Sequence, residues 1–159
     1  MVLIIMGVAG CGKTSVGKML SEKLVWKYYE GDEYHPKENV EKMSNGIPLN
    51  DEDRMPWLLK LRSIIEDSLS NGENIILSSS ALKEAYRKIL KVDDRVKFIY
   101  LKGSYELIEG RMKLRKEHFM KPGMLKSQFD ALEEPTYAIV IDINQPLEKI
   151  VENILQKIQ

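Results

Sequence analysis

The sequence predicts an α/β domain with a largely parallel, five-stranded sheet flanked by helices. Its 159 residues suit one compact domain with a single core. Short apolar runs alternate along the chain with segments whose apolar residues recur at helical spacing. Strands that alternate with helices usually pair in parallel. Because the sequence contains no repeat, low-complexity segment or linker, we treat residues 1–159 as one domain.

Five segments are expected to be strands. Residues 2–6 are all apolar, which is typical of a buried strand. The other four expected strands are residues 27–30, 75–77, 96–101 and 138–141. Ligands bind at the carboxyl ends of parallel strands, so the loops that follow these segments are the first places to look for chemistry.

Helices are expected between the strands. They begin near Thr14, cover residues 58–69, 82–90 and 105–116, and end with one that starts near Pro146. Proline is favoured at the first position of a helix, which supports the last of these starts.

Composition excludes several classes of protein. Lys plus Arg and Asp plus Glu both number 24, so the formal net charge is zero. A nucleic-acid-binding protein usually carries a basic excess, and we expect no nucleic-acid partner. The single cysteine excludes an internal disulfide and suits the reducing cytoplasm. The apolar run at the start is too short to span a membrane, so we expect a soluble cytoplasmic protein.

The loop after the first strand reads GVAGCGKT, the complete Walker A pattern. It lies between an expected strand and an expected helix, where backbone N–H groups and the helix N-terminus can bind phosphate. This predicts the three-layer P-loop NTPase fold with ATP as cofactor. The residues expected to bind the nucleotide here are Gly7, Val8, Ala9, Gly10, Cys11, Gly12, Lys13, Thr14 and Ser15.

Within this loop, three side chains have separate expected roles. Lys13 should reach the β- and γ-phosphates, and the Thr14 hydroxyl should ligate Mg²⁺. Cys11 is either a reactive thiol activated by the helix N-terminus or a small packing residue.

Other features favour a small-molecule kinase over a GTPase or an ATP hydrolase. The sequence has no Asn/Thr-Lys-x-Asp motif to read guanine. The strand at residues 75–77 is followed by three serines, where a hydrolase would place an acid. Asp142 follows the last strand, and we interpret it as a turn or base-pocket residue. In small-molecule kinases of this type, the metal-linked acid comes from the second strand.

That second strand ends in Glu30-Gly31-Asp32. Asp32 is placed to orient an acceptor hydroxyl or to receive its proton. A plain structural role, capping the next turn, is the alternative.

Residues 30–58, EGDEYHPKENVEKMSNGIPLNDEDRMPWL, closely resemble the gluconokinase family, which is similar to shikimate and nucleoside monophosphate kinases. Further matching fragments lie at residues 80–87, 118–120, 127–133 and 142–147, so the resemblance covers essentially the whole chain. Glu117, Glu134 and Ser79 depart from the usual pattern, but none of them removes a group that the chemistry needs.

The resemblance implies phosphorylation of D-gluconate at its 6-hydroxyl with ATP and Mg²⁺, by a protein that forms a homodimer. Recognition of a carboxylate with several hydroxyls calls for cations and polar groups. Lys83 and Arg87 stand four apart, and we expect them to share one helix face. The residues implied to bind gluconate are Asp32, His35, Lys42, Arg54, Lys83, Arg87 and His118. For His118 the alternative is a structural role in packing the lid.

The resemblance also implies a small lid over about residues 111–126. Arg111 and Arg115 would then meet the transferring phosphate, although a solvated basic face is the alternative. Gln145 and Pro146 are expected to lie at the nucleotide base.

Two other functions stay open at this point. One is a related kinase for another small hydroxy acid or a nucleoside monophosphate. The other is a catalytically silent ATP-binding regulator. Against the first, a shikimate-type site would show Asp-x-Asp where this chain has Glu30-Gly31-Asp32.

Overall fold

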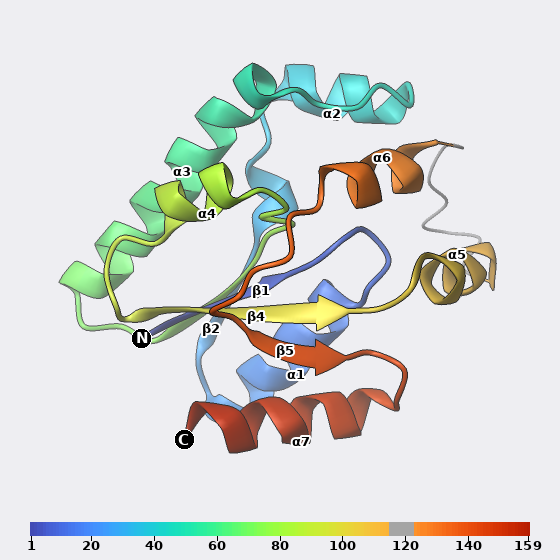
Figure 1. The fold of residues 1–159 in the computed structure, drawn as a ribbon. Coiled ribbons are helices and arrows are strands. Elements are labelled where there is room, and N and C mark those ends of the chain that lie inside the picture. The colour runs from blue at the N-terminus through green and yellow to red at the C-terminus, as the bar shows by residue number, and fades with distance from the viewer. Residues whose placement is uncertain (115–122) are drawn as a thin grey trace.

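The computed structural model describes residues 1–114 and 123–159. Its five strands form one parallel sheet in the order β2-β3-β1-β4-β5 (Figure 1). The strands are β1 (Val2–Met6), β2 (Lys27–Glu30), β3 (Ile75–Ser78), β4 (Val96–Lys102) and β5 (Ile139–Asp142). All five lie at the predicted places, and their bounds differ from the prediction by one residue at most.

Helices cover both faces of the sheet. Helices α1 and α7 pack on one face, and α3 and α4 pack on the other (Figure 1). The helices described are α1 (Lys13–Leu24), α2 (Lys37–Ser44), α3 (Asp51–Ser70), α4 (Glu84–Leu90), α5 (Tyr105–Leu114), α6 (Met124–Ala131) and α7 (Leu147–Ile158). A short 3-10 turn, η1 (Gly31–Tyr34), follows β2. No helix in these described ranges is long and apolar enough to cross a membrane.

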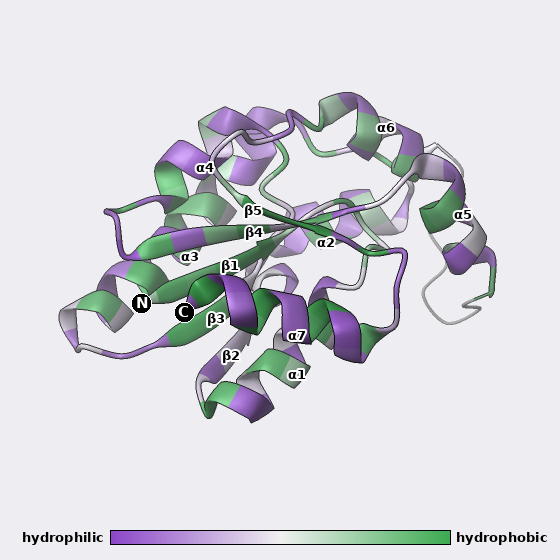
Figure 2. Cartoon of the chain, turned by 60° about the horizontal axis from the view of Figure 1, so that its bottom comes forward, coloured by the Kyte–Doolittle hydropathy of each residue, from purple (hydrophilic) through white to green (hydrophobic). Residues whose placement is uncertain are grey.

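The central strand β1 is completely buried, and its side chains alternate between two hydrophobic clusters. Leu3 and Ile5 pack with α1 and α7, whereas Ile4 packs with α3 and α4. Figure 2 shows the matching pattern on α7, where hydrophobic and hydrophilic residues alternate around the helix. Burial on both sides explains why β1 is apolar throughout.

Four helical features differ from the prediction, and the first is that α4 begins at Glu84 rather than at residue 82. Helix α3 begins at Asp51 rather than residue 58, because Asn50 and Asp53 form a capping box there. The Asn50 side chain accepts from the Asp53 N–H at 2.7 Å, and the Asp53 side chain accepts from the Asn50 N–H at 3.0 Å. Helices α2 and α6 were not predicted. Pro146 precedes α7 as its cap instead of being its first residue.

Candidate active site

The phosphate loop connects β1 to α1 at the carboxyl end of the sheet (Figure 1). Gly10 and Gly12 have φ angles of +79° and +101°, a backbone region that favours glycine. Lys13 is the first residue of α1, and its Nζ donates to the carbonyl oxygens of Gly7 and Val8 at 2.9 and 3.0 Å. The ammonium group therefore lies across the loop, where the phosphates of a nucleotide would bind.

Cys11 is buried in this loop and is only 1% exposed. Burial raises the pKa of its thiol, although Lys13 partly opposes that effect. A Cβ at Gly7 would lie 2.7 Å from the Cys11 sulfur, so the two residues are in close contact. Of the two roles considered for Cys11, this environment favours the packing residue, because a buried neutral thiol is a poor nucleophile.

Glu30 is the last residue of β2, and its carboxylate accepts hydrogen bonds from three hydroxyl groups. Its Oε2 accepts hydrogen bonds from Thr14 Oγ1 at 2.6 Å and from the Tyr28 hydroxyl at 2.7 Å. Its Oε1 accepts from Ser78 Oγ at 2.8 Å. Partial burial raises the pKa of Glu30, but these hydrogen bonds and the charge of Lys13 outweigh it and hold the pKa below its usual value. A carboxylate is thus present beside the Thr14 hydroxyl at neutral pH.

This pair of oxygen ligands fits Mg²⁺, which is usually held by one or two protein groups together with water and substrate phosphates. Sequence reasoning placed the metal-linked acid on the second strand but did not single out Glu30 as a site residue. The signal was available, because Glu30 directly precedes the Gly31-Asp32 pair at the end of that strand.

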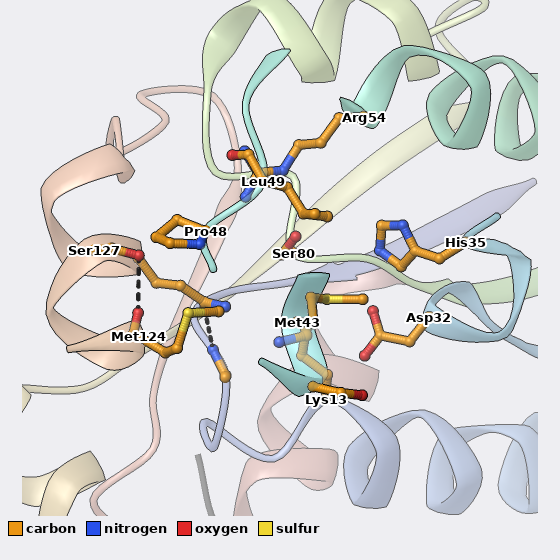
Figure 3. Close-up of a pocket in the computed structure, with 13 residues that line it drawn as sticks. Lys13, Asp32, His35, Met43, Pro48, Leu49, Arg54, Ser80, Met124 and Ser127 are labelled. Carbon is orange, nitrogen blue, oxygen red and sulfur yellow. Dashed lines mark hydrogen bonds between the residues drawn. The ribbon is translucent and has the colours of Figure 1, made fainter. Parts of the chain in front are cut away.

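Gly31 brings the loop after β2 into contact with β3. A Cβ at this position would lie 1.9 Å from the Ser78 carbonyl oxygen, so only glycine fits. The close approach sets the position of η1, which carries Asp32. Figure 3 shows the side chains of Asp32 and His35 entering the same pocket from this side.

That pocket is a cavity of about 340 Å³ in front of the phosphate loop (Figure 3). Residues from the phosphate loop and the start of α1, the turn after β2, α2, the α2–α3 connection, the start of α3, the loop after β3, and α6 line it. They are Ala9, Lys13, Asp32, His35, Met43, Ser44, Pro48, Leu49, Arg54, Ser80, Met124, Ser127 and Gln128. Of these, Ala9, Lys13, Asp32, His35 and Arg54 were predicted from the sequence as site residues.

Besides Lys13, Arg54 is a cation that lines this cavity. Its Nη1 donates to the Leu49 carbonyl at 2.7 Å and to the Tyr86 hydroxyl at 3.1 Å. Arg54 also lines an adjoining cavity of about 420 Å³, which it shares with Lys83. Lys83 pairs there with Asp51 at 3.1 Å.

The other two predicted cations are already paired within the protein. Lys42 donates to both carboxylate oxygens of Asp53 at 2.9 Å. Arg87 is 1% exposed, and its guanidinium is surrounded by acceptors. They are the carbonyl oxygens of Ala81, Leu82 and Glu133, the Glu84 carboxylate and the Tyr137 hydroxyl.

These contacts correct two expectations about Arg87. It does not share a helix face with Lys83, because Lys83 precedes α4 in extended conformation. Its guanidinium also points into the protein instead of a cavity, because it satisfies buried carbonyl groups. The geometry gives Arg87 a structural role and does not support a contact with substrate.

A third cavity of about 330 Å³ lies on the α1 and α7 side of the phosphate loop. It is lined by Cys11, Gly12, Ser15, Val16, Arg111, Leu114, Gln145, Leu147 and Ile150. Arg111 Nη2 donates to the Ile143 carbonyl at 2.8 Å. This places Arg111 beside Gln145, on the side expected for the base, and not in the cavity of Asp32, where we expected it to meet the transferring phosphate.

The turn after β5 agrees with its prediction. The Asp142 carboxylate accepts from the Asn144 N–H at 2.8 Å, and Gln145 Nε2 donates to the Asp142 carbonyl at 2.7 Å. Asp142, the last residue of β5, therefore stabilises the turn that follows and holds Gln145 in place. Pro146 follows directly and caps α7.

Sequence reasoning missed the contribution of α6. Gln128 Oε1 accepts from the Ala9 N–H at 2.6 Å, so α6 contacts the phosphate loop directly. Ser127-Gln128 was recognised only as a fragment of a family pattern, because no local signal shows which cavity a helix reaches. Arg115 and His118 lie outside the described residues, as does half of the expected lid.

Comparisons with known proteins show the family of the chain. A family model for shikimate kinase matches residues 9–159. A probable gluconokinase of Rattus norvegicus is 40% identical over 180 residues, which cover 99% of this chain and 97% of the relative. The thermoresistant gluconokinase of Escherichia coli K12 is 40% identical over 163 residues, with 99% and 93% covered. A gluconokinase structure from Sinorhizobium meliloti 1021 superposes with a TM-score of 0.86 at 39% identity, covering 98% of this chain and 89% of that one. The chain therefore belongs to the gluconokinase family of P-loop kinases.

Proposed function

We propose that this protein transfers the γ-phosphate of ATP to the 6-hydroxyl of D-gluconate, giving ADP and 6-phospho-D-gluconate. One observation carries the proposal: Lys13 of the phosphate loop, Asp32 and Arg54 line a single cavity. Its volume of about 340 Å³ falls within the usual range for a small-molecule site. Identity of 40% to gluconokinases over nearly the full chain supports the choice of substrate.

On the nucleotide side, the loop N–H groups and Lys13 bind the phosphates and neutralise charge as the phosphoryl group moves. Thr14 and Glu30 are the residues that would hold Mg²⁺, which when bound neutralises charge on the β- and γ-phosphate oxygens. We place the base in the cavity lined by Arg111 and Gln145, and Pro146 lies in the sequence between the lining residues Gln145 and Leu147.

On the acceptor side, Asp32 orients the 6-hydroxyl and takes its proton. A bond forms between the hydroxyl oxygen and the γ-phosphorus, while the bond from that phosphorus to the β–γ bridging oxygen breaks and ADP leaves. Gluconate carries its carboxylate at the opposite end from the 6-hydroxyl. Arg54, which lies in the same cavity as Asp32, is the residue we assign to the carboxylate.

The family resemblance supports three further proposals. The protein acts as a homodimer, works in the cytoplasm, and supplies 6-phosphogluconate to sugar-acid breakdown and the pentose phosphate pathway. Light scattering on the purified protein tests the first of these: a mass near 37 kDa, about twice the 18.4 kDa of one chain, is expected. A mass of one chain at assay concentration contradicts it.

The function is tested by measuring ADP release from Mg-ATP with gluconate, shikimate, glycerate, AMP or no acceptor. We expect turnover with gluconate well above every other acceptor, and none with Lys13→Ala, which removes the phosphate-binding ammonium. Strong turnover with a different acceptor overturns the choice of substrate. If the protein binds ATP but phosphorylates none of these acceptors, the result favours the alternative of a catalytically silent ATP-binding regulator.

A further inference from the structure

The imidazole ring of His35 is held on two sides. It stacks on Trp57 with ring centroids 4.1 Å apart and an angle of 18° between the planes. Trp57 is itself fixed, because it is buried and its Nε1 donates to the Gly31 carbonyl at 2.8 Å. On a second side, His35 Nδ1 lies 3.1 Å from Asn39 Nδ2. The ring therefore has a defined orientation where it lines the acceptor cavity (Figure 3).

Asn39 determines which ring nitrogen carries the proton. Its side chain is buried, and Nδ2 also lies 2.8 Å from the Asp53 carbonyl oxygen, which can only accept. The amide must therefore present NH₂ at this end, since the opposite orientation would place two oxygens in contact. One amide hydrogen goes to Asp53 and the second goes to His35 Nδ1, which has to be an unprotonated acceptor.

The surroundings also keep the ring neutral. Burial lowers the pKa of His35, the nearby Asp32 opposes that effect, and Arg54 adds to it, with a net lowering. Protonation would in addition set the Nδ1–H against the Asn39 NH₂, two donors facing each other. The single proton of the neutral ring is then on Nε2. Within residues 1–114 and 123–159, no protein group accepts a hydrogen bond from it.

We propose that Asn39 is a positioning residue that fixes His35 as its Nε2–H tautomer, and that His35 donates this hydrogen bond to an oxygen of the acceptor in the cavity. In that state His35 has no free lone pair facing the substrate, so it cannot compete with Asp32 for the hydroxyl proton. The inference rests on the proposed function for the identity of the acceptor, a polyhydroxy acid rich in hydroxyl oxygens.

The tautomer is tested first, without any activity measurement. The chain has two histidines, so ¹⁵N-detected NMR of the labelled protein gives two imidazole spin systems, and His35→Gln identifies which belongs to His35. We expect an unprotonated Nδ1 and a protonated Nε2 at pH 7. A protonated Nδ1 overturns the proposal whatever substrate the enzyme uses.

Asn39→Asp reverses the hydrogen bond to His35, because a carboxylate accepts from Nδ1–H, and it also removes the donor to the Asp53 carbonyl. We expect the pKa of His35 to rise by about one unit or more, as for a histidine beside a carboxylate. Asn71→Asp is the matched control, because this substitution makes the same change of charge at an exposed residue at the end of α3. Equal pKa values for His35 in the two variants contradict the role of Asn39.

Kinetics test the donated hydrogen bond. His35→Ala should raise KM for gluconate by about tenfold, the equivalent of one hydrogen bond, and leave KM for ATP unchanged. His35→Gln, which retains an N–H donor of similar reach, should recover most of that loss. An unchanged KM for gluconate in His35→Ala overturns the donor role. If gluconate is not a substrate at all, the proposed function fails, while the NMR result still decides the tautomer.

Discussion

Replacing Arg87 should destabilise the protein strongly without removing a contact to substrate. Its guanidinium donates to the carbonyl oxygens of Ala81, Leu82 and Glu133 at 2.7, 3.1 and 2.7 Å. These bonds join the loop after β3 to the segment that follows α6. Arg87→Ala leaves the carbonyls of Ala81 and Glu133 without donors at a site that is closed to solvent, whereas the Leu82 carbonyl still accepts from the Glu133 N–H at 2.8 Å. Since each buried acceptor left unpaired costs ~1–3 kcal/mol, and such losses are only partly additive, we expect a loss of about 3–5 kcal/mol.

Urea unfolding, followed by tryptophan fluorescence, measures this loss. Arg87→Lys keeps the charge but not the fork of donors, so its loss should be intermediate. Arg95→Ala is the control, because the Arg95 side chain pairs with Asp93 on the surface and should contribute about 1 kcal/mol or less. An Arg87→Ala protein as stable as Arg95→Ala refutes the structural role. A folded Arg87→Ala protein with a large rise in KM for gluconate restores the substrate role predicted from sequence.

Three other predictions concern the site and its support. Asp32→Asn should lower kcat by about 10²-fold or more if Asp32 accepts the proton, and a loss below tenfold in a steady-state assay reduces it to a positioning group. Because the pKa of Glu30 is lowered in the folded protein, its carboxylate stabilises the fold at pH values above the ordinary pKa of glutamate. This contribution to the free energy of unfolding is lost as the pH falls through the lowered pKa. The stability gap between wild type and Glu30→Gln should therefore shrink in urea unfolding as pH falls from ~6 to ~3, and a constant gap contradicts the assignment. Gly31→Ala forces a Cβ to 1.9 Å from the Ser78 carbonyl and should prevent normal folding, whereas Gly110→Ala, which meets no atom within 4 Å, should melt at or above the wild-type temperature. If Gly31→Ala has the same melting temperature as the wild type, the steric argument for glycine at this position is wrong.

Features encoded in neighbouring residues were predicted best. The phosphate loop is contiguous in sequence, and each expected strand carries its apolar run within a few residues, so local reading was enough. The start of α3 was missed because the apolar repeat begins at Leu58. The signal for the true start is a different one, the cap at Asn50 followed by three acidic residues in the first turn.

Features that depend on tertiary contacts were not predictable in the same way. Arg54 and Arg87 look equivalent as charged residues in a sequence, yet one lines the cavity and the other is buried among carbonyl groups. The difference arises from the packing of α4 against the segment after α6. Similarly, Gln128 reaches the Ala9 N–H across 119 positions of sequence, and no local pattern encodes that distance.

Phosphorus NMR of the reaction products tests the central claim most directly. Purified protein is incubated with Mg-ATP and D-gluconate, and the new ³¹P resonance is recorded without proton decoupling. Transfer to the 6-hydroxyl predicts a phosphate monoester signal split into a triplet by the two protons on C6, in equal amount to the ADP formed. A doublet contradicts the account, because it indicates transfer to a secondary hydroxyl. Inorganic phosphate as the only new signal besides those of ADP also contradicts it.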